Sequence, residues 1–126
     1  MRELERNIPN YPSWEGSFYE RLTEYCEWKS DLFWVLHCDL LNAALLAKDE
    51  PIDRNLVHML LYLQERVLTL IAAHFNKNGV FEISNLTDKQ LHEYTERFNM
   101  AILGVITAEV LPEASFNLVN PLVKNA

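Results

Sequence analysis

Apolar side chains recur every three or four residues along almost the whole chain after Trp14, and this spacing most constrains the fold. Residues three and four apart lie on one face of an α-helix, so each such stretch predicts a helix with one buried face. Only three glycines and five prolines occur in 126 residues, too few for the many turns of a β-sandwich or barrel. The sequence therefore predicts an all-α protein.

Breaks in this pattern divide the chain into helices. The segments 17–20 and 87–90 have the form of capping boxes, which begin helices. Asn78-Gly79 and Pro112 are typical of helix ends. A single domain follows, a bundle of four main helices with an irregular N-terminal arm and a C-terminal tail. The expected order is arm 1–12, helices 13–29, 31–47, 52–77 and 88–111, and tail 112–126.

Two segments carry further expectations about packing. The helix over 31–47 is apolar nearly all round, with Leu45 and Leu46 at its end, so we expect it to be largely buried. Residues 80–83 alternate briefly between apolar and polar character, so a short extended segment is an alternative interpretation there.

The helix expected over 13–29 carries a narrow acidic arc, free of lysine and arginine. Its members are Glu20, Glu24, Glu27 and Asp31. Like charges at helical spacing cost about 0.2–0.5 kcal/mol per pair, so an isolated protein gains nothing from the arc. A basic partner would turn this repulsion into attraction. A solvated outer face is the alternative interpretation.

Aromatic residues concentrate beside this arc. Eight of the fourteen lie between residues 11 and 34, more than two helices easily bury. Core packing accounts for Phe18 and Tyr25. Tyr19 and Trp28 flank the apolar stripe, where a surplus aromatic side chain anchors a protein interface. The predicted partner-binding surface therefore consists of Tyr19, Glu20, Glu24, Glu27, Trp28 and Asp31.

The charge balance favours a basic protein partner. Eighteen acidic and eleven basic side chains give a net charge of −7, which opposes direct binding of nucleic acid. In size, charge and helix content the whole chain is similar to small acidic helical immunity proteins and antitoxins that neutralise nuclease toxins. The resemblance implies a non-enzymatic inhibitor that covers a basic surface of its partner.

The helix expected over 52–77 carries the main alternative. Arg54, His58, Tyr62 and Glu65 lie on one side of it, and a histidine beside arginine and tyrosine suits acid–base catalysis on RNA or a nucleotide. The same residues form the polar arc that an amphipathic helix needs. A structural subunit of a helical homo-oligomer, such as a homodimer, is a further alternative.

No motif indicates a cofactor or a metal site. The chain contains no Glu-x-x-His or His-Glu-x-x-His pattern and no glycine-rich phosphate loop. Cys26 and Cys38 lack zinc or redox spacing, and free thiols suit a reducing compartment. The charged N-terminus is unlike a secretory signal, and polar residues interrupt the apolar window 56–75. We therefore expect a cytoplasmic protein that uses no cofactor, metal or membrane.

Overall fold

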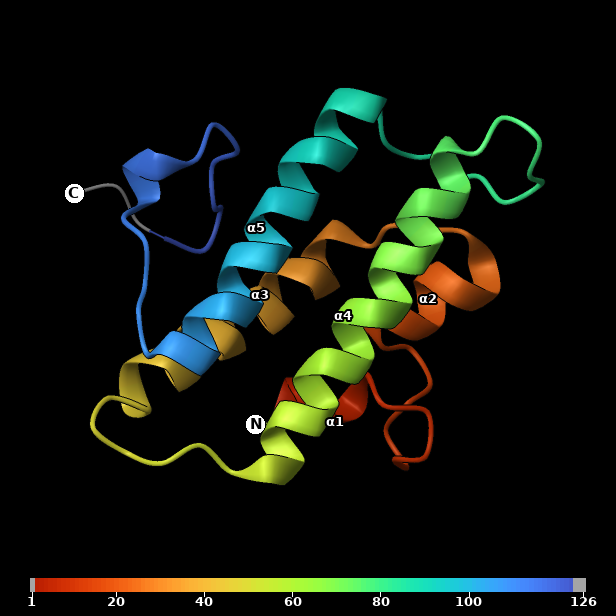
Figure 1. Cartoon of the computed structure of the whole chain (residues 1–126). Helices are drawn as coiled ribbons and strands as arrows, with labels where there is room; N and C mark the ends of the chain where they lie inside the picture. Colours follow the sequence, from red (N-terminus) through yellow and green to blue (C-terminus); the bar gives the residue numbers. More distant parts are fainter. Residues whose placement is uncertain (1, 124–126) are drawn as a thin grey trace.

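The computed structural model describes residues 2–123, and this part of the chain contains five α-helices, one short 3-10 helix and no strand (Figure 1). The predicted all-α bundle is confirmed, and residues 80–83 are irregular rather than extended in a sheet. The helices are α1 (Arg2–Arg6), α2 (Phe18–Tyr25), α3 (Ser30–Leu46), α4 (Arg54–Phe75) and α5 (Asp88–Thr107), and the 3-10 helix η1 spans Glu113–Ser115.

Helices α3 and α5 pack side by side and run in the same direction. The Tyr94 hydroxyl donates to Ser30 Oγ over 2.9 Å where both helices begin, and Ala44 and Thr107 line one hollow where both end. Helix α4 runs antiparallel to α5 (Figure 1), and Gln64 Nε2 of α4 donates to Asn99 Oδ1 of α5 over 3.2 Å.

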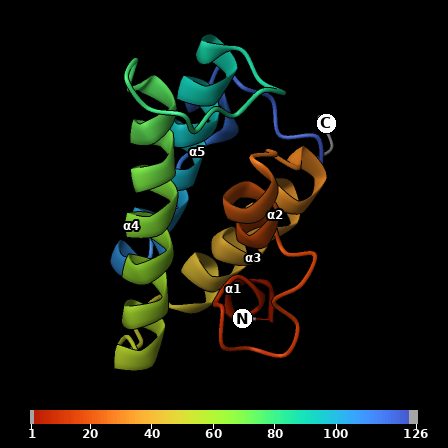
Figure 2. The same ribbon diagram turned by 90° about the vertical axis from the view of Figure 1, so that its right-hand side faces the viewer.

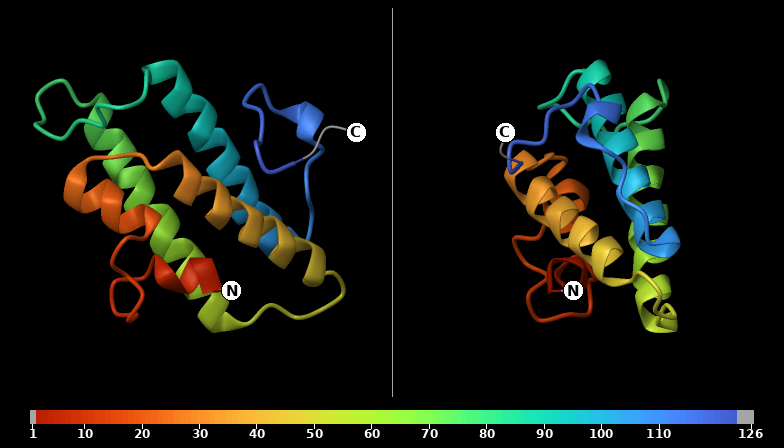
Figure 3. Two further views of the ribbon diagram at one scale, coloured as in Figure 1. Left: turned by 180° about the vertical axis from the view of Figure 1, so that it is seen from behind. Right: turned by 90° about the vertical axis from the view of Figure 1, so that its left-hand side faces the viewer.

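The two short helices lie on the same side of α4 as α3. Both α1 and α2 contact α3 and α4, and Figure 2 shows α4 on one side and α1, α2 and α3 together on the other. Seen from behind, α1 and α2 cross α4 and lie beside α3 (Figure 3). The N-terminal arm is therefore part of the bundle. Residues 2–6 are helical rather than irregular, and Leu4 is fully buried in the core.

Aromatic rings form the centre of the core. The ring centroids of Phe18 and Trp28 are 4.8 Å apart, and those of Phe33 and Tyr94 are 5.0 Å apart, both in edge-to-face geometry. Such pairs contribute about 0.5–1.5 kcal/mol each beyond the area they bury. Trp34 completes the cluster, so α2, α3, α5 and the α2–α3 link all meet through aromatic side chains.

The helix predicted over 13–29 is much shorter in the structure. Ser17 Oγ accepts from the Glu20 amide and begins α2, as the capping box predicts. Cys26 then takes a left-handed conformation (φ 55°), and its amide donates to Leu22 O while the Glu27 amide donates to Arg21 O. This pair of bonds ends the helix. Residues 26–29 turn instead of continuing the helix.

The last long helix also ends early, and the tail folds back. Helix α5 ends at Thr107, and Ala108 is left-handed (φ 59°). The Glu109 amide donates to Gly104 O, and a Cβ at Gly104 would collide with the Glu109 carbonyl oxygen. Only glycine, which has no Cβ, permits this close approach. Gly104, four residues before Ala108, therefore allows the chain to turn back at the end of α5.

One of the described helices, α4, is long enough and apolar enough to cross a membrane by length and composition alone. Only 28% of its most apolar window is buried in the fold. A single helix of this kind does not assign a location, but it shows that α4 exposes much of its surface.

Candidate partner-binding surface

The predicted acidic arc is not one surface in the structure. Because α2 ends at Tyr25, Glu27 lies in the link to α3 and Asp31 lies in the first turn of α3. Glu20 is buried, and its Oε1 accepts from the Gly16 amide over 3.0 Å. Its carboxylate therefore completes the cap of α2, and the predicted role of Glu20 in partner binding is wrong.

The other acidic residues differ in their surroundings. Glu24 and Asp31 are exposed, as predicted. Glu27 Oε1 lies 3.8 Å from Arg21 Nε, so a basic group already neutralises part of this corner. Lys29 follows two residues later in the same link. The corner therefore carries less negative charge than the sequence pattern indicates.

Both predicted aromatic anchors lie inside the protein. Tyr19 is buried, which raises the pKa of its hydroxyl, and Trp28 is 1% exposed. Asn85 fixes Trp28 by both backbone groups, since its Oδ1 accepts from the Trp28 amide over 3.0 Å and its Nδ2 donates to the Trp28 carbonyl over 2.8 Å. The turn at Cys26 directs Trp28 into the core. The predicted anchor roles of Tyr19 and Trp28 are therefore wrong.

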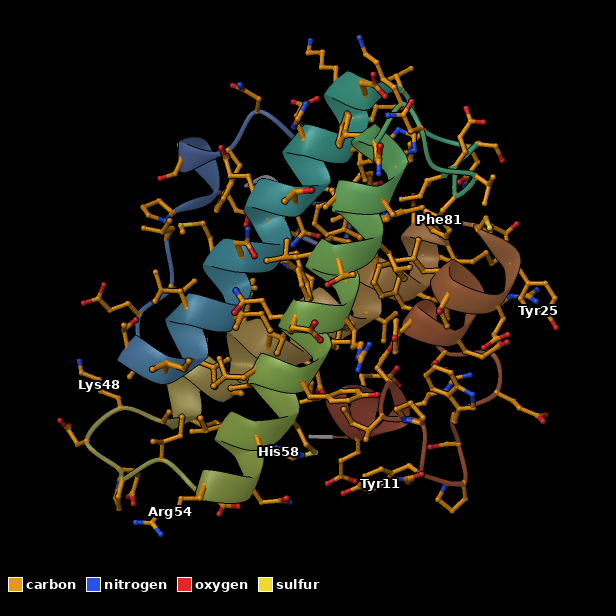
Figure 4. The ribbon with its side chains drawn as sticks, turned by 45° about the vertical axis from the view of Figure 1, so that its right-hand side comes forward. Tyr11, Tyr25, Lys48, Arg54, His58 and Phe81 are labelled. Carbon is orange, nitrogen blue, oxygen red and sulfur yellow. The ribbon has the colours of Figure 1, made fainter. Side chains whose placement is uncertain are left out.

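Tyr25, expected in the core, points outward instead. It is 61% exposed, and the Arg21 guanidinium lies 4.8 Å from its ring centroid. Figure 4 shows its side chain extending away from the end of α2. A single exposed aromatic residue that stacks on an arginine of its own helix forms only a small part of the surface.

The polar residues of α4 lie along one outer side of that helix. Arg54 and His58 are exposed on its first two turns (Figure 4). The His58 and Tyr62 ring centroids are 6.4 Å apart, and the Arg66 guanidinium lies 5.6 Å from the Tyr62 ring. Among the described residues, no other element supplies a hydrogen bond or ion pair to Arg54 or His58. Tyr19 of α2 is the titratable group that another element brings near the set, since the charges of Tyr62, Arg66 and Glu65 all act on its hydroxyl.

Metal-ligating residues are dispersed over the part of the chain that the structure describes. No three His, Cys, Asp or Glu side chains gather there closely enough to hold a metal ion. Cys26 and Cys38 are free thiols.

An ion pair between buried Arg97 and partly exposed Glu113, which the sequence pattern does not predict, holds the tail, and we call it the clamp. Arg97 is buried and donates from Nη1 and Nη2 to the two Glu113 carboxylate oxygens, each over 2.8 Å. Its Nε and Nη2 also donate to the Leu118 carbonyl. The Arg97 guanidinium lies 4.1 Å from the Phe116 ring centroid. These contacts use most of the guanidinium donors, so the clamp is structural.

His37 lies beside this clamp. Its side chain is 2% exposed, and its Nδ1 is buried without a hydrogen-bond partner. Burial, and then the positive charge of Arg97, lower the pKa of His37 from 6.5 to about 4. The hydrogen bond from Arg97 lowers the pKa of Glu113. A space of about 10 Å³ beside the three side chains has room for a single water.

An apolar surface lies where α3 and α5 both end. We call it the end patch, and it consists of Leu45, Leu46, Leu103, Val110 and Leu111. These side chains are exposed, from 38% for Val110 to 81% for Leu46. The expectation that the end of the helix over 31–47 is buried is therefore wrong. Helix α4 contacts α1, α2 and α5 but not α3, so it leaves this end uncovered.

Charged residues surround the end patch. Leu45 shares one hollow with Lys48, Asp49 and Glu109. Leu103 and Leu111 share a second hollow with the same Glu109, which joins the two halves of the patch. Glu50 follows in the loop after α3, and Lys48 stands at the same end of the molecule in Figure 4. The two hollows therefore hold two carboxylates, those of Asp49 and Glu109, and the ammonium group of Lys48.

No protein-family model, curated protein or solved structure matches the chain. The function must therefore be inferred from the surfaces of this protein alone.

Proposed function

We propose that this protein is a non-enzymatic binding protein that covers a basic protein partner with its end patch, in the manner of immunity proteins and antitoxins that neutralise nuclease toxins. The observation that carries the proposal is the group of five exposed aliphatic side chains at the shared end of α3 and α5. Leu45 borders one hollow and Leu103 and Leu111 border a second, and Glu109 lines both. Exposed aliphatic side chains grouped around such hollows favour an interaction site, because water contact with them is unfavourable.

The energetic argument favours a protein as the ligand. Complete burial of an aliphatic side chain contributes about 1.5–3 kcal/mol, so these half-exposed residues offer roughly 1 kcal/mol each on binding. A partner must present complementary apolar groups to gain this energy. The hollows beside Leu45 and Leu103 provide the concave shape into which such groups fit.

The charges supply selectivity for a basic partner. Asp49 and Glu109 outnumber Lys48 at the rim, and the whole chain carries a net charge of −7. Acidic charges around an apolar centre steer a basic partner during association and disfavour acidic competitors. Asp31 lies at the other end of α3, about 25 Å away for a 17-residue helix. This distance exceeds the Debye length of about 8 Å at physiological salt, so Asp31 contributes little to binding at the end patch.

The test uses a double variant of the patch, Leu45→Asp with Leu103→Asp. Wild type, this variant and a control are used as bait in extract from the native host, and the retained protein is identified, purified and titrated against each. The control is Val80→Asp, because Val80 is a fully exposed aliphatic residue on the loop before α5. The expected result is a basic partner bound by wild type and control.

The double variant is expected to weaken binding at least about 100-fold, because the loss of two buried aliphatic contacts and the burial of two charges exceeds about 2.8 kcal/mol. Affinity for the partner is also expected to fall as salt rises. An acidic partner, or equal affinity of wild type and the double variant, would remove the end patch from the mechanism.

A further inference from the structure

The outer face of α4 is distinct from the end patch, and we infer that it is the contact of a two-fold homodimer. In this dimer α4 packs antiparallel against α4 of a second copy. The inference goes beyond the proposed function, because it assigns a different surface and a different partner.

The face consists of Arg54, His58, Leu61 and Glu65, which follow one another at helical spacing of four, three and four residues. All four are exposed, and Leu61 is 50% exposed. Residues at this spacing form one continuous stripe along a helix. The stripe contains one positive and one negative group at its two ends and an aliphatic residue near its middle.

Helix α5 extends this face with another aliphatic residue. Asn99 accepts a hydrogen bond from Gln64, so its side of α5 faces α4. Ile106 lies seven residues later on the same side of α5 and is 42% exposed. Leu61 lies three residues before Gln64 on α4, which packs against α5. Both aliphatic side chains are exposed in the described residues 2–123, and only 28% of the most apolar window of α4 is buried.

The charge pattern is self-complementary. When two copies of the stripe pair antiparallel about an axis between His58 and Leu61, Arg54 lies opposite Glu65 of the second copy. Two-fold symmetry repeats the pair, so two ion pairs flank the central contacts of Leu61. Among the described residues Arg54 has no ion pair, and Glu65 is bonded within α4 to Thr69 and Arg66, all at the surface. Both ends of the stripe are therefore accessible to a second copy.

Charge also explains why a second copy fits this face rather than the end patch. Each copy carries a net charge of −7, so self-association needs a contact where like charges are not opposed. The stripe is neutral overall, since Arg54 balances Glu65. The rim of the end patch is acidic, and two copies meeting there would place carboxylates against carboxylates.

The experiment measures mass in solution, by light scattering after gel filtration and by sedimentation equilibrium over a range of concentrations. The expected mass approaches twice 14.7 kDa for the wild type. Arg54→Glu alone and Glu65→Arg alone each oppose like charges twice in the dimer, and each is expected to raise its dissociation constant at least about tenfold. The combination of both substitutions restores the pairs in reverse order, and with them the wild-type constant.

Matched controls change the same charges elsewhere. Lys77→Glu and Glu24→Arg alter exposed residues outside the stripe and are expected to leave the dimer intact. Leu61→Gln is expected to weaken the dimer without adding charge, and circular dichroism checks that each variant is folded. The rescue by the double substitution separates a contact across the axis from a loss of helix stability.

Three results would overturn the inference. The first is a wild type that stays monomeric at every concentration. The second is a dimer that the single substitutions leave unchanged, or that the double substitution fails to restore. The third is a monomer that floats with phosphatidylcholine–phosphatidylglycerol vesicles through Leu61, which would assign the outer face of α4 to a membrane.

Discussion

Acid should destabilise this fold through His37. The imidazole lies between aromatic rings, with its centroid 5.2 Å from that of Trp34 and 5.8 Å from that of Phe33. Arg97 faces it from α5, and Glu113 faces it from the tail, where the carboxylate partly offsets the effect of the guanidinium. Burial and Arg97 dominate, so the pKa of His37 is lowered to about 4 and the ring is neutral at pH 7.

The direction of the pH effect follows from this lowered pKa. The unfolded chain binds a proton at His37 below its ordinary pKa of 6.5, whereas the folded protein binds one only near pH 4. The stability that neutral His37 contributes is complete above pH 6.5 and is lost as the pH falls to about 4. A difference of about 2.5 pKa units corresponds to roughly 3 kcal/mol. This is a large share of the 5–15 kcal/mol typical of a small domain.

The assay compares the free energy of unfolding of wild type and His37→Leu in urea, by tryptophan fluorescence at pH 7 and pH 4. At pH 7 the two are expected to agree within about 1 kcal/mol, because Nδ1 of His37 has no hydrogen bond to lose and leucine packs well against the rings. At pH 4 the wild type is expected to lose roughly 3 kcal/mol more than the variant.

The comparison removes the main effect of Glu113. The hydrogen bond from Arg97 is the largest cause of the lowered pKa of Glu113 and is present in both proteins, so acid destabilises both through this carboxylate, and the smaller effect of His37 on Glu113 counts as part of the His37 difference. The exposed His92 supplies the control, since His92→Gln should follow the wild type. Equal losses of stability in wild type and His37→Leu between pH 7 and pH 4 would refute the reasoning.

Two further predictions concern the tail. Gly104→Ala places a Cβ against the Glu109 carbonyl oxygen, so it should lower the free energy of unfolding by about 1–3 kcal/mol, measured by thermal unfolding. Gly79→Ala is the control, because the nearest atom to its Cβ is 3.4 Å away and its cost should be about 0.5 kcal/mol or less. Equal costs for the two variants would contradict the clash. Arg97→Met removes the charge-assisted hydrogen bonds to Glu113 and should lower the free energy of unfolding by about 2–3 kcal/mol. It should also speed proteolysis after residue 108. An unchanged cleavage pattern would contradict the clamp.

Local rules predicted the elements whose signals are local. The capping box at Thr87 forms both of its bonds, since the hydroxyl accepts from the Gln90 amide and the Gln90 side chain accepts from the Thr87 amide. At Ser17 the hydroxyl bond forms as expected, but the Glu20 carboxylate accepts from the Gly16 amide, one residue earlier. Periodicity and caps depend on neighbours within one or two turns, so the sequence contains the information they need.

The sequence did not predict the end of α2 at Cys26, and the reason lies in contacts distant in sequence. A non-glycine residue in the left-handed region costs only about 1–2 kcal/mol. The apolar surface of the buried Trp28 ring and its contacts with three other rings oppose this cost, although the indole Nε1 is buried without a hydrogen-bond partner. The aromatic cluster around Trp28 lies on α2, α3 and α5, so the gain depends on contacts distant in sequence. No residue near Cys26 signals the stop. The predicted helix continued past it, which placed Trp28 outside and Tyr25 inside.

The end patch was missed for a similar reason. Leu45 and Leu46 continue the apolar pattern of α3 without a change, and composition cannot tell whether another helix covers the last turn. That depends on where α4 crosses the bundle, and its contacts are with α1, α2 and α5. The sequence contained a weak signal for the clamp at Arg97. A charged residue on the inner face of α5, between Tyr94 and Ala101, needs a partner that compensates its charge. Its partner Glu113 lies in a tail without periodicity.

The clamp also bears on how the end patch binds. Val110 and Leu111 belong to the tail and stand two to three residues before Glu113, so the Arg97–Glu113 pair fixes half of the patch against α5. Leu45 and Leu46 are fixed independently by α3. A surface held in its binding conformation loses less conformational entropy on association. Arg97→Met should therefore slow partner capture less than it speeds release, because the rim charges stay while half of the apolar contact becomes mobile. Such a change in release, from a residue that the partner never touches, would connect the stability of the tail to the function of the patch.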